Sequence, residues 1–254
     1  MFYKSPSLKN LNLTYKVLRE AKNTCVGSIR HICDFRYRIG RILLEHSYEK
    51  RFGIETSEPH IFKDKVSLYK DEAQYFPTPY NVLEKIIEYL KLRHGDVFID
   101  MGCGKGRVAF FVGTQRLKKI IGIELRKEIS DAAKRNLNSL KINNTPIEIF
   151  NADIISFNVA EGTVFFMYNP FGCQTFVRAI DKIKDSLIMN PRKVRIVYYG
   201  EIYRGLLDSQ DWLEPEGEII GAHTFVWRNK DQPFSRTGSK EKMEEALENQ
   251  ISKI

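Results

Sequence analysis

Three glycines at alternating positions follow an apolar run that ends in a carboxylate. The run is Val97–Asp100, and the glycines are Gly102, Gly104 and Gly106 in the stretch VFIDMGCGKG. Glycine has no Cβ, so a loop built from it lets the backbone approach a ligand closely. A carboxylate beside the loop disfavours a pyrophosphate and suits a cation, and G-x-G-x-G differs from the G-x-G-x-x-G of dinucleotide-binding loops. The stretch therefore predicts a nucleoside-like, positively charged cofactor and disfavours a nicotinamide oxidoreductase.

Apolar runs of strand length alternate with amphipathic runs of helical period in the second half of the sequence. The expected strands are 97–100, 119–125, 147–153, 163–169, 193–199 and 222–229, the last paired with 217–221, and the expected helices are 77–92, 107–114, 127–140, 174–189 and 201–207. In the first helix, Asn81 and Glu84 have the spacing of a capping box, and Gly95 is expected to close the helix. The alternation predicts an α/β fold: a Rossmann-like, doubly wound, seven-stranded and mostly parallel sheet with an antiparallel last strand, plus an N-terminal helical extension.

The run FIDMGCGKGR resembles the first motif of class I S-adenosylmethionine-dependent methyltransferases, hydrophobic-x-D-x-G-x-G-x-G. The resemblance extends over about residues 75–229 in the order of its elements. It implies S-adenosyl-L-methionine as the cofactor, whose sulfonium and ammonium groups match the carboxylate beside the glycines. The loop residues that it implies for cofactor binding are Asp100, Gly102, Cys103, Gly104 and Gly106.

Two further acids and one upstream segment extend the resemblance. Glu124 ends the second strand, where the family uses an acid to accept hydrogen bonds from both ribose hydroxyls. A carboxylate offers two acceptor oxygens to such adjacent donors. Asp153 ends the third strand, where the family binds the adenine amino group. Tyr75 and Thr78, in YFPTP, lie where related enzymes close over the cofactor, so we expect them at the methionine or adenine end.

The stretch YNPF ends the fourth strand and looks like the [DN]-P-P-[FYW] signature of methyltransferases that act on nitrogen. In those enzymes the Asn oxygen and the next carbonyl accept hydrogen bonds from the target N–H groups, and the aromatic ring stacks on a planar group. Asn169, Pro170 and Phe171 match and are the expected catalytic residues, whereas one proline of the signature is missing. In this respect the chain departs from the signature of methyltransferases that act on planar nitrogen groups.

The resemblance implies in-line methyl transfer to a nitrogen acceptor, with a protein side chain favoured. Three alternatives stay open: a methyltransferase of nucleic-acid bases, a small-molecule methyltransferase and a non-catalytic cofactor-binding protein. Residues 1–44 contain nine Lys and Arg and only two acids, a charge of +7 out of the net +8. Such a segment fits nucleic acid or an acidic protein, or is a solvated helical face.

Composition and patterning set the expected domains and location. The expected domains are a basic N-terminal extension at 1–75 that serves as a lid or substrate platform, a methyltransferase domain at 76–232 and a charged helix or tail at 233–254. The four cysteines form no CxxC pair, so we expect neither a metal site nor a disulfide. No apolar run has the length of a membrane span, and the start of the sequence lacks a signal peptide's apolar core. We therefore expect a cytoplasmic protein with no membrane partner; the sequence does not specify an oligomeric state.

Overall fold

The computed structural model describes residues 29–58 and 75–231, with side chains from residue 38 onward. The chain divides into two compact units, 1–53 and 54–254. The division lies upstream of the boundary expected at residue 75, because Thr56 and Ser57 are hydrogen bonded to Arg107 of the second unit. The expected C-terminal helix or tail at 233–254 lies outside the described residues, and the role of the N-terminal extension stays a prediction.

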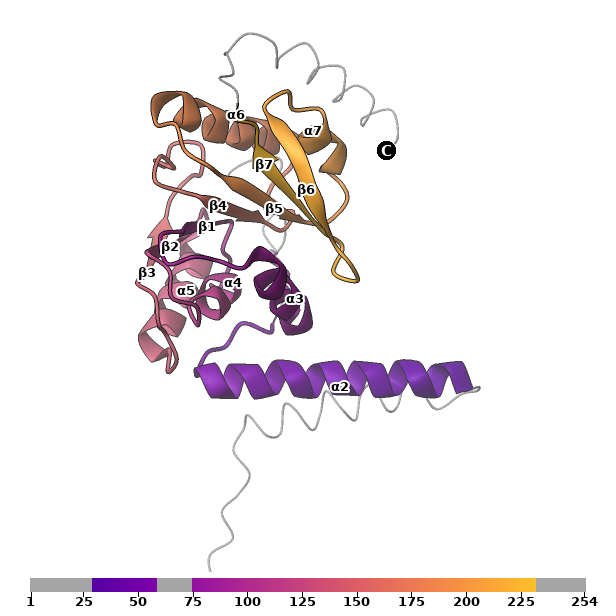
Figure 1. Ribbon diagram of the computed structural model, residues 1–254. Coiled ribbons are helices and arrows are strands. Elements are labelled where there is room, and N and C mark those ends of the chain that lie inside the picture. The colour runs from indigo at the N-terminus through magenta and orange to yellow at the C-terminus, as the bar shows by residue number, and fades with distance from the viewer. Residues whose placement is uncertain (1–28, 59–74, 232–254) are drawn as a thin grey trace, which may run out of the picture. The chain divides into compact units, whose positions relative to one another are not determined.

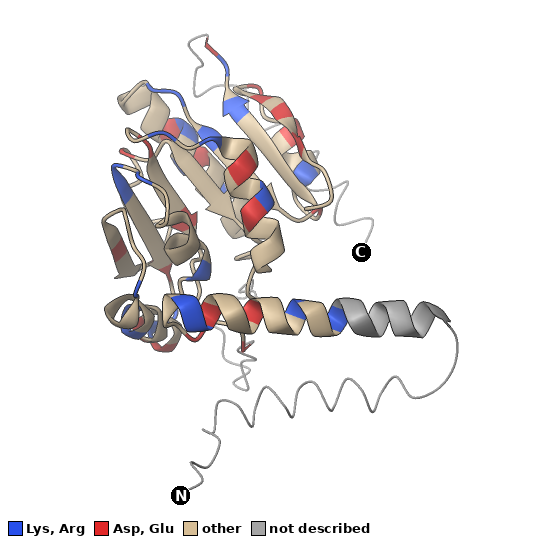
Figure 2. Ribbon diagram, turned by 60° about the horizontal axis from the view of Figure 1, so that its bottom comes forward, with Lys and Arg blue, Asp and Glu red and all other residues tan. Residues whose placement is uncertain are grey.

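The described part of the first unit is one helix, α2 (Ile29–Phe52). Basic positions recur along it, and Lys50 and Arg51 lie in its last turn, where positive charge complements the helix dipole (Figure 2). Tyr48 and Phe52, one helical turn apart, stack with ring centroids 6.1 Å apart. No helix within the described ranges has both the length and the apolar character that crossing a bilayer requires.

The second unit is built on a seven-stranded sheet (Figure 1). Its strands are β1 (Val97–Met101), β2 (Lys119–Glu124), β3 (Ile147–Asn151), β4 (Val164–Met167), β5 (Arg195–Tyr199), β6 (Leu213–Ile219) and β7 (Thr224–Asn229). Their order is β3-β2-β1-β4-β5-β7-β6, and the pairs from β3 to β5 are parallel. β7 is antiparallel to both β5 and β6. The predicted Rossmann-like sheet with an antiparallel last strand is confirmed.

Five helices cover the two faces of this sheet. They are α3 (Tyr80–Leu90), α4 (Arg107–Val112), α5 (Lys127–Ser139), α6 (Cys173–Met189) and α7 (Arg204–Asp208). α3, α4 and α5 lie on one face, and α6 and α7 lie on the other (Figure 1). Alternate residues of each strand serve the two faces: Ile99 belongs to the core cluster beneath α6, whereas Phe98 stacks on Phe166 of the neighbouring strand.

The expected ends of α3 are wrong. The helix begins at Tyr80 with Pro79 as its N-cap, whose fixed φ suits a helix start, and no side chain caps it. Asn81 therefore lies inside the first turn and cannot act as the cap. At the other end, Lys91 adopts a left-handed φ of 45° and ends the helix before Gly95.

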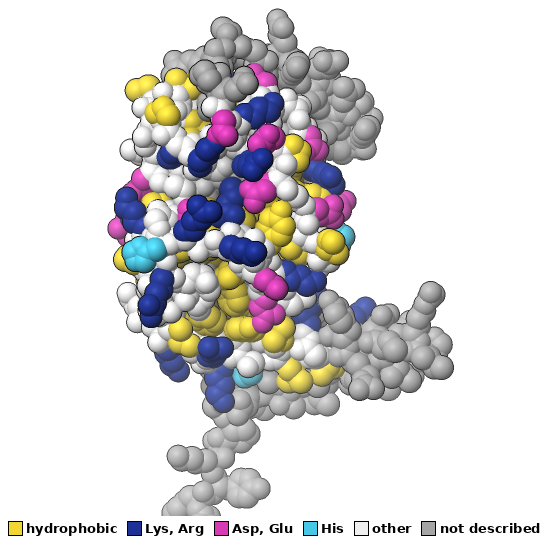
Figure 3. Space-filling view, viewed as in Figure 1, with side chains coloured by type: hydrophobic (Ala, Val, Ile, Leu, Met, Phe, Trp, Pro, Cys, Tyr) yellow, Lys and Arg dark blue, Asp and Glu magenta, His cyan; other side chains and the backbone are white. Residues whose placement is uncertain are grey.

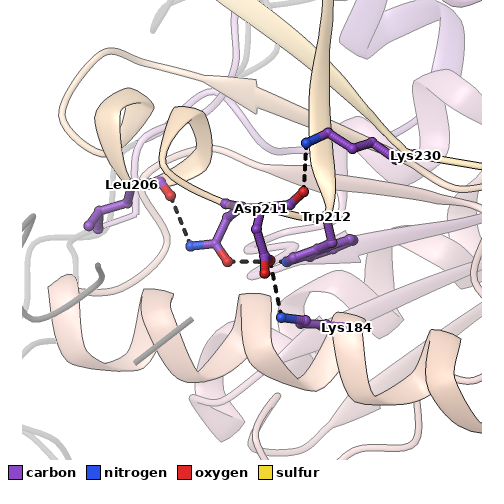
Figure 4. Close-up of polar contacts among 6 residues, drawn as sticks. Lys184, Leu206, Asp211, Trp212 and Lys230 are labelled. Carbon is purple, nitrogen blue, oxygen red and sulfur yellow. Dashed lines mark hydrogen bonds and ion pairs between the residues drawn. The ribbon is translucent and has the colours of Figure 1, made fainter. Parts of the chain in front are cut away.

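A polar cluster joins α6 to the segment between α7 and β6 (Figure 4). Lys184 of α6 is only 3% exposed, and its Nζ lies 3.2 Å from Oδ1 of Asp211. Lys230, just after β7, donates to the Asp211 carbonyl at 2.6 Å. Beside them, the indole N–H of the buried Trp212 donates to Oε1 of Gln210 at 3.1 Å. One acidic residue thus connects α6, the start of β6 and the end of β7.

Replacing Asp211 with Asn is expected to lower the free energy of unfolding by about 1–2 kcal/mol, because it removes the carboxylate charge that lies 3.2 Å from the buried ammonium of Lys184. The value lies below that of fully buried pairs because Asp211 is itself 39% exposed. Urea denaturation measures it. Glu88→Gln, at an exposed position of α3, is the matched control, and equal stability of the two variants would contradict the role of the pair.

Candidate active site

A cavity opens at the carboxyl ends of β1, β2 and β4, where the strand order reverses around β1. Ligands of doubly wound sheets bind at this switch point. All residues that the sequence analysis placed at the site line the cavity except Gly106: they are Tyr75, Thr78, Asp100, Gly102, Cys103, Gly104, Glu124, Asp153, Asn169, Pro170 and Phe171. The structure therefore brings together segments more than ninety residues apart in the sequence.

The glycine loop has positive φ angles and almost no room for side chains. Gly102 has φ of 87°, and a Cβ there would overlap the ring of Pro170. Gly104 has φ of 55°, and a Cβ there would overlap the ring of Tyr75. Both conformation and space therefore require glycine at these positions. The loop is thus enclosed by the upstream segment on one side and by the YNPF stretch on the other.

Two of the predicted loop residues, Gly106 and Cys103, serve the packing of the fold. Gly106 precedes α4, and a Cβ there would meet the ring of Phe110, so this glycine allows the helix to pack rather than facing the cavity. Cys103 lines the cavity, but it is 5% exposed. Burial, with the nearby charges of Asp100 and Glu124, raises the pKa of its thiol well above the usual value. The thiol stays protonated and is a packing group rather than a nucleophile.

Asp100 is a buried carboxyl at the floor of the cavity. It is 2% exposed, and within the described residues its Oδ2 has no hydrogen-bond partner. Its pKa is raised to about 8: burial is the main cause, a hydrogen bond from the Ala109 backbone opposes the rise, and the charge of Glu124 adds to it. At neutral pH this carboxyl is therefore largely protonated until a cation approaches it. A site of this kind favours a positively charged ligand.

Glu124 is held in a fixed orientation at the end of β2. Its Oε2 accepts a hydrogen bond from the Gly104 N–H at 3.0 Å, and its Oε1 accepts one from the Arg126 N–H at 2.9 Å. A carboxylate has acceptor positions beyond these two. The geometry suits the predicted binding of two adjacent hydroxyl groups, because both oxygens are positioned before the ligand arrives.

Asp153 lies two residues beyond the end of β3, within a turn that it stabilises itself. Its Oδ1 accepts a hydrogen bond from the Ile155 N–H at 2.9 Å, as in an Asx-turn. The neighbouring Ala152 and Ile154 also line the cavity and give it apolar walls on both sides of the acid. This arrangement fits the predicted contact with a flat, polar-edged ring.

Asn169 lies past the end of β4 rather than within the strand, because it adopts a left-handed φ of 39°. Its Oδ1 accepts a hydrogen bond from the hydroxyl of Tyr198 on β5, and that hydroxyl accepts one from the Tyr203 N–H at 3.2 Å. Burial raises the pKa of Tyr198, so its hydroxyl remains a donor. The amide of Asn169 is therefore oriented by a buried neutral partner.

Aromatic side chains form part of the lining of the cavity. Phe76, Tyr168 and Phe171 line it, and Phe76 is 51% exposed. The ring of Tyr168 packs on that of Tyr199 with centroids 4.3 Å apart.

Within 29–58 and 75–231, no group of three His, Cys, Asp or Glu residues is arranged to hold a metal ion.

Among the residues that the sequence analysis missed are Tyr198 and Arg107. Tyr198 is fully buried in β5, and its tyrosine hydroxyl has no sequence signal that distinguishes it from an ordinary core aromatic. Arg107 follows the last glycine and also lines the cavity, yet it is 2% exposed. Its position directly after the glycine loop was a signal that Arg107 lies near the site. Its burial could not be predicted, because it depends on partners that are distant in the sequence.

Comparisons with known proteins agree with this geometry. Residues 64–165 match the family model described as histone methylation protein DOT1. The chain is 30% identical over 149 residues to a histone-lysine N-methyltransferase specific for H3 lysine-79 from Dictyostelium discoideum. The aligned region covers 54% of this chain and 8% of that protein. It is 27% identical over 101 residues to a protein-lysine N-methyltransferase from Saccharolobus islandicus, covering 39% and 62% of the two chains.

Other similarities are shorter or concern the fold. Bacterial proteins named uncharacterized RNA methyltransferases are 28–35% identical over 72–93 residues. The solved structure of a putative methyltransferase from Escherichia coli has a TM-score of 0.50 and 20% identity, covering 61% of this chain and 92% of that one. The chain spans less than two thirds of the length of the curated relatives described here.

The strand order and the glycine loop are those of the class I S-adenosylmethionine-dependent methyltransferase fold, and the similarities in sequence are to methyltransferases. Within that class, residues 64–165 resemble the DOT1 family. S-adenosyl-L-methionine is the cofactor of the class, and the cationic groups of this molecule suit the buried carboxyl of Asp100.

The affinity for S-adenosylmethionine is expected to rise with pH between 6 and 8. Asp100 has a pKa of about 8, so below that pH the bound cation must displace a proton, and the displacement becomes easier as pH rises. Calorimetric titration across this range measures the effect. Asp100→Asn should flatten the profile, and the control Asp131→Asn, at a half-buried position of α5 outside the cavity lining, should retain it. The same slope in Asp100→Asn would contradict the assignment.

Replacing Glu124 with Ala is expected to weaken cofactor binding by ~1.5–3 kcal/mol, the usual value of a hydrogen bond to a charged group. Glu124→Gln keeps one acceptor oxygen and should lose less. Calorimetry with S-adenosylhomocysteine gives both values. Affinity unchanged in the Ala variant would show that the ribose does not bind at the end of β2.

Proposed function

We propose that this protein transfers the methyl group of S-adenosylmethionine to a side-chain nitrogen of a protein, with lysine as the favoured acceptor. One observation carries the proposal: Asn169, Pro170 and Phe171 line the same cavity as the glycine loop, with Pro170 packed against Gly102. The predicted donor and acceptor groups therefore share one wall. The similarity to DOT1 and to two protein-lysine methyltransferases supports the choice of acceptor.

When bound, the cofactor supplies the methyl group and a sulfonium leaving group, so the protein mainly has to align the acceptor. Asn169 is suited to this because its amide oxygen is held by Tyr198 and retains a second lone pair for an acceptor N–H. A lysine ammonium must first lose one proton to water; the neutral amine, with one N–H bonded to Asn169, then has its lone pair left for the methyl carbon. Alignment of this kind can supply about 7–11 kcal/mol of the barrier reduction.

The aromatic side chains that line the cavity support a lysine acceptor. The rings of Phe76, Tyr168 and Phe171 offer an apolar passage to the four-carbon stem of lysine and π-faces to its cation.

RNA is the second candidate acceptor. Its support is the similarity to proteins named RNA methyltransferases and the basic charge of residues 1–44. On the face shown in Figure 3, however, Lys and Arg side chains are mixed with Asp and Glu. A nucleic-acid surface is usually a continuous basic patch or stripe. The described residues on this face therefore form no such continuous patch.

Incubation of the protein with cell extract and methyl-labelled S-adenosylmethionine tests the proposal. We expect label in material that protease digests and RNase does not, and in methylated lysine after hydrolysis. Label in RNA would overturn the protein acceptor in favour of RNA.

Asn169→Ala is expected to lower the rate of labelling by about 100-fold through lost alignment, with the affinity for S-adenosylhomocysteine within about 2-fold of wild type. Asn138→Ala, at an exposed position of α5, is the control and should label like wild type. Full labelling by the Asn169 variant would remove that residue from the transfer step.

A further inference from the structure

Arg107 makes an unusual set of contacts for a residue at a helix start. It is the first residue of α4 and is 2% exposed. Its Nε donates to Oγ1 of Thr56 at 2.7 Å, its Nη2 donates to Oγ of Ser57 at 2.9 Å, and its Nη1 donates to the carbonyl of Thr78 at 3.1 Å. One guanidinium thus binds two segments that are about twenty residues apart in the sequence.

The guanidinium is also packed on an aromatic ring. Its central carbon lies 4.4 Å from the ring centroid of Tyr80, the first residue of α3. This cation–π contact and the planar fork of donors fix the position of the group from several directions. A lysine ammonium lacks the fork and cannot make the same three bonds from one position.

A second set of contacts connects the same segments with the glycine loop. The hydroxyl of Tyr75 donates to the carbonyl of Thr56 at 2.8 Å, while the ring of Tyr75 fills the space beside Gly104. Lys105, within the loop, donates to the carbonyl of Glu58 at 2.8 Å. Residues 54–58 and 75–78 are therefore joined to each other and to the loop that follows β1.

Asn136 of α5 completes the attachment. Its Oδ1 accepts from the Glu55 N–H at 3.0 Å, and its Nδ2 donates to the carbonyls of Glu55 at 3.2 Å and Lys105 at 3.1 Å. A single side chain therefore binds both the upstream segment and the glycine loop. Of the residues held in this way, Tyr75 and Thr78 line the cavity.

We propose that Arg107 is a positioning residue for the cofactor: it holds residues 54–57 and 75–78 together so that Tyr75 and Thr78 form a wall over the glycine loop and slow the release of the cofactor. The inference rests on the proposed function, since it requires that this cavity binds S-adenosylmethionine. Arg107 acts through its neighbours, because its three described donors are bonded to Thr56, Ser57 and Thr78.

The test compares binding and release of S-adenosylhomocysteine in the full chain. Arg107→Gln is expected to raise the dissociation rate constant by about 10-fold or more, the usual effect of losing charged hydrogen bonds, with the association rate constant within about 2-fold. Arg107→Lys should give an intermediate value because it keeps the charge without the fork. Arg116→Gln, at an exposed position after α4, is the matched control and should match wild type.

Hydrogen exchange separates positioning from general stability. In wild type, S-adenosylhomocysteine is expected to slow exchange at the amides of residues 54–57, and in Arg107→Gln this slowing should disappear while protection of β1 is retained. Tyr75→Phe removes only the hydroxyl bond to Thr56 and should raise the dissociation rate by about 3- to 10-fold. If Arg107→Gln does not fold, the Tyr75→Phe result decides: faster release supports the proposal, and unchanged release overturns it.

The failure of this inference is distinguishable from the failure of the proposed function. Wild type that binds no S-adenosylhomocysteine would overturn the cofactor site itself. If wild type binds S-adenosylhomocysteine and both folded variants, Arg107→Gln and Arg107→Lys, release it at the wild-type rate, only the positioning role of Arg107 would be overturned.

Discussion

The buried carboxyl of Asp100 is the constraint on which the site depends. A carboxyl that is 2% exposed at the end of a central strand is costly when ionised, and a fold keeps one there only with compensation. In this protein the glycine loop leaves the space beside the carboxyl free of side chains. A cationic ligand in that space would offset the free-energy cost of ionising Asp100, whereas an anionic ligand would increase it.

The surrounding elements can be understood as supports for that space. β2 brings Glu124, whose two oxygens accept hydrogen bonds from the backbone N–H groups of Gly104 and Arg126, and these bonds orient the carboxylate. The upstream segment brings the ring of Tyr75 over the loop. On the opposite side, β5 brings the hydroxyl of Tyr198 to Asn169. Donor and acceptor groups are therefore each oriented by partners from a different element.

Much of the fold was predictable from the sequence, because strands buried on both faces are continuous apolar runs with polar residues at their carboxyl ends. The positions of Glu124 and Asp153 followed from this pattern together with the family resemblance. Local chemistry was less reliable: the capping role of Asn81 failed because Pro79, which fixes its own φ, starts the helix. The expected strand through residue 169 failed because Asn169 turns into a left-handed conformation that only the neighbouring elements enforce.

The contact between Gly102 and Pro170 has a consequence for how this protein can diverge. Any side chain at position 102 would displace the proline, and with it the adjacent Asn169. Substitutions in the glycine loop are thus coupled to the YNPF stretch, and a redesign of one loop would have to include the other.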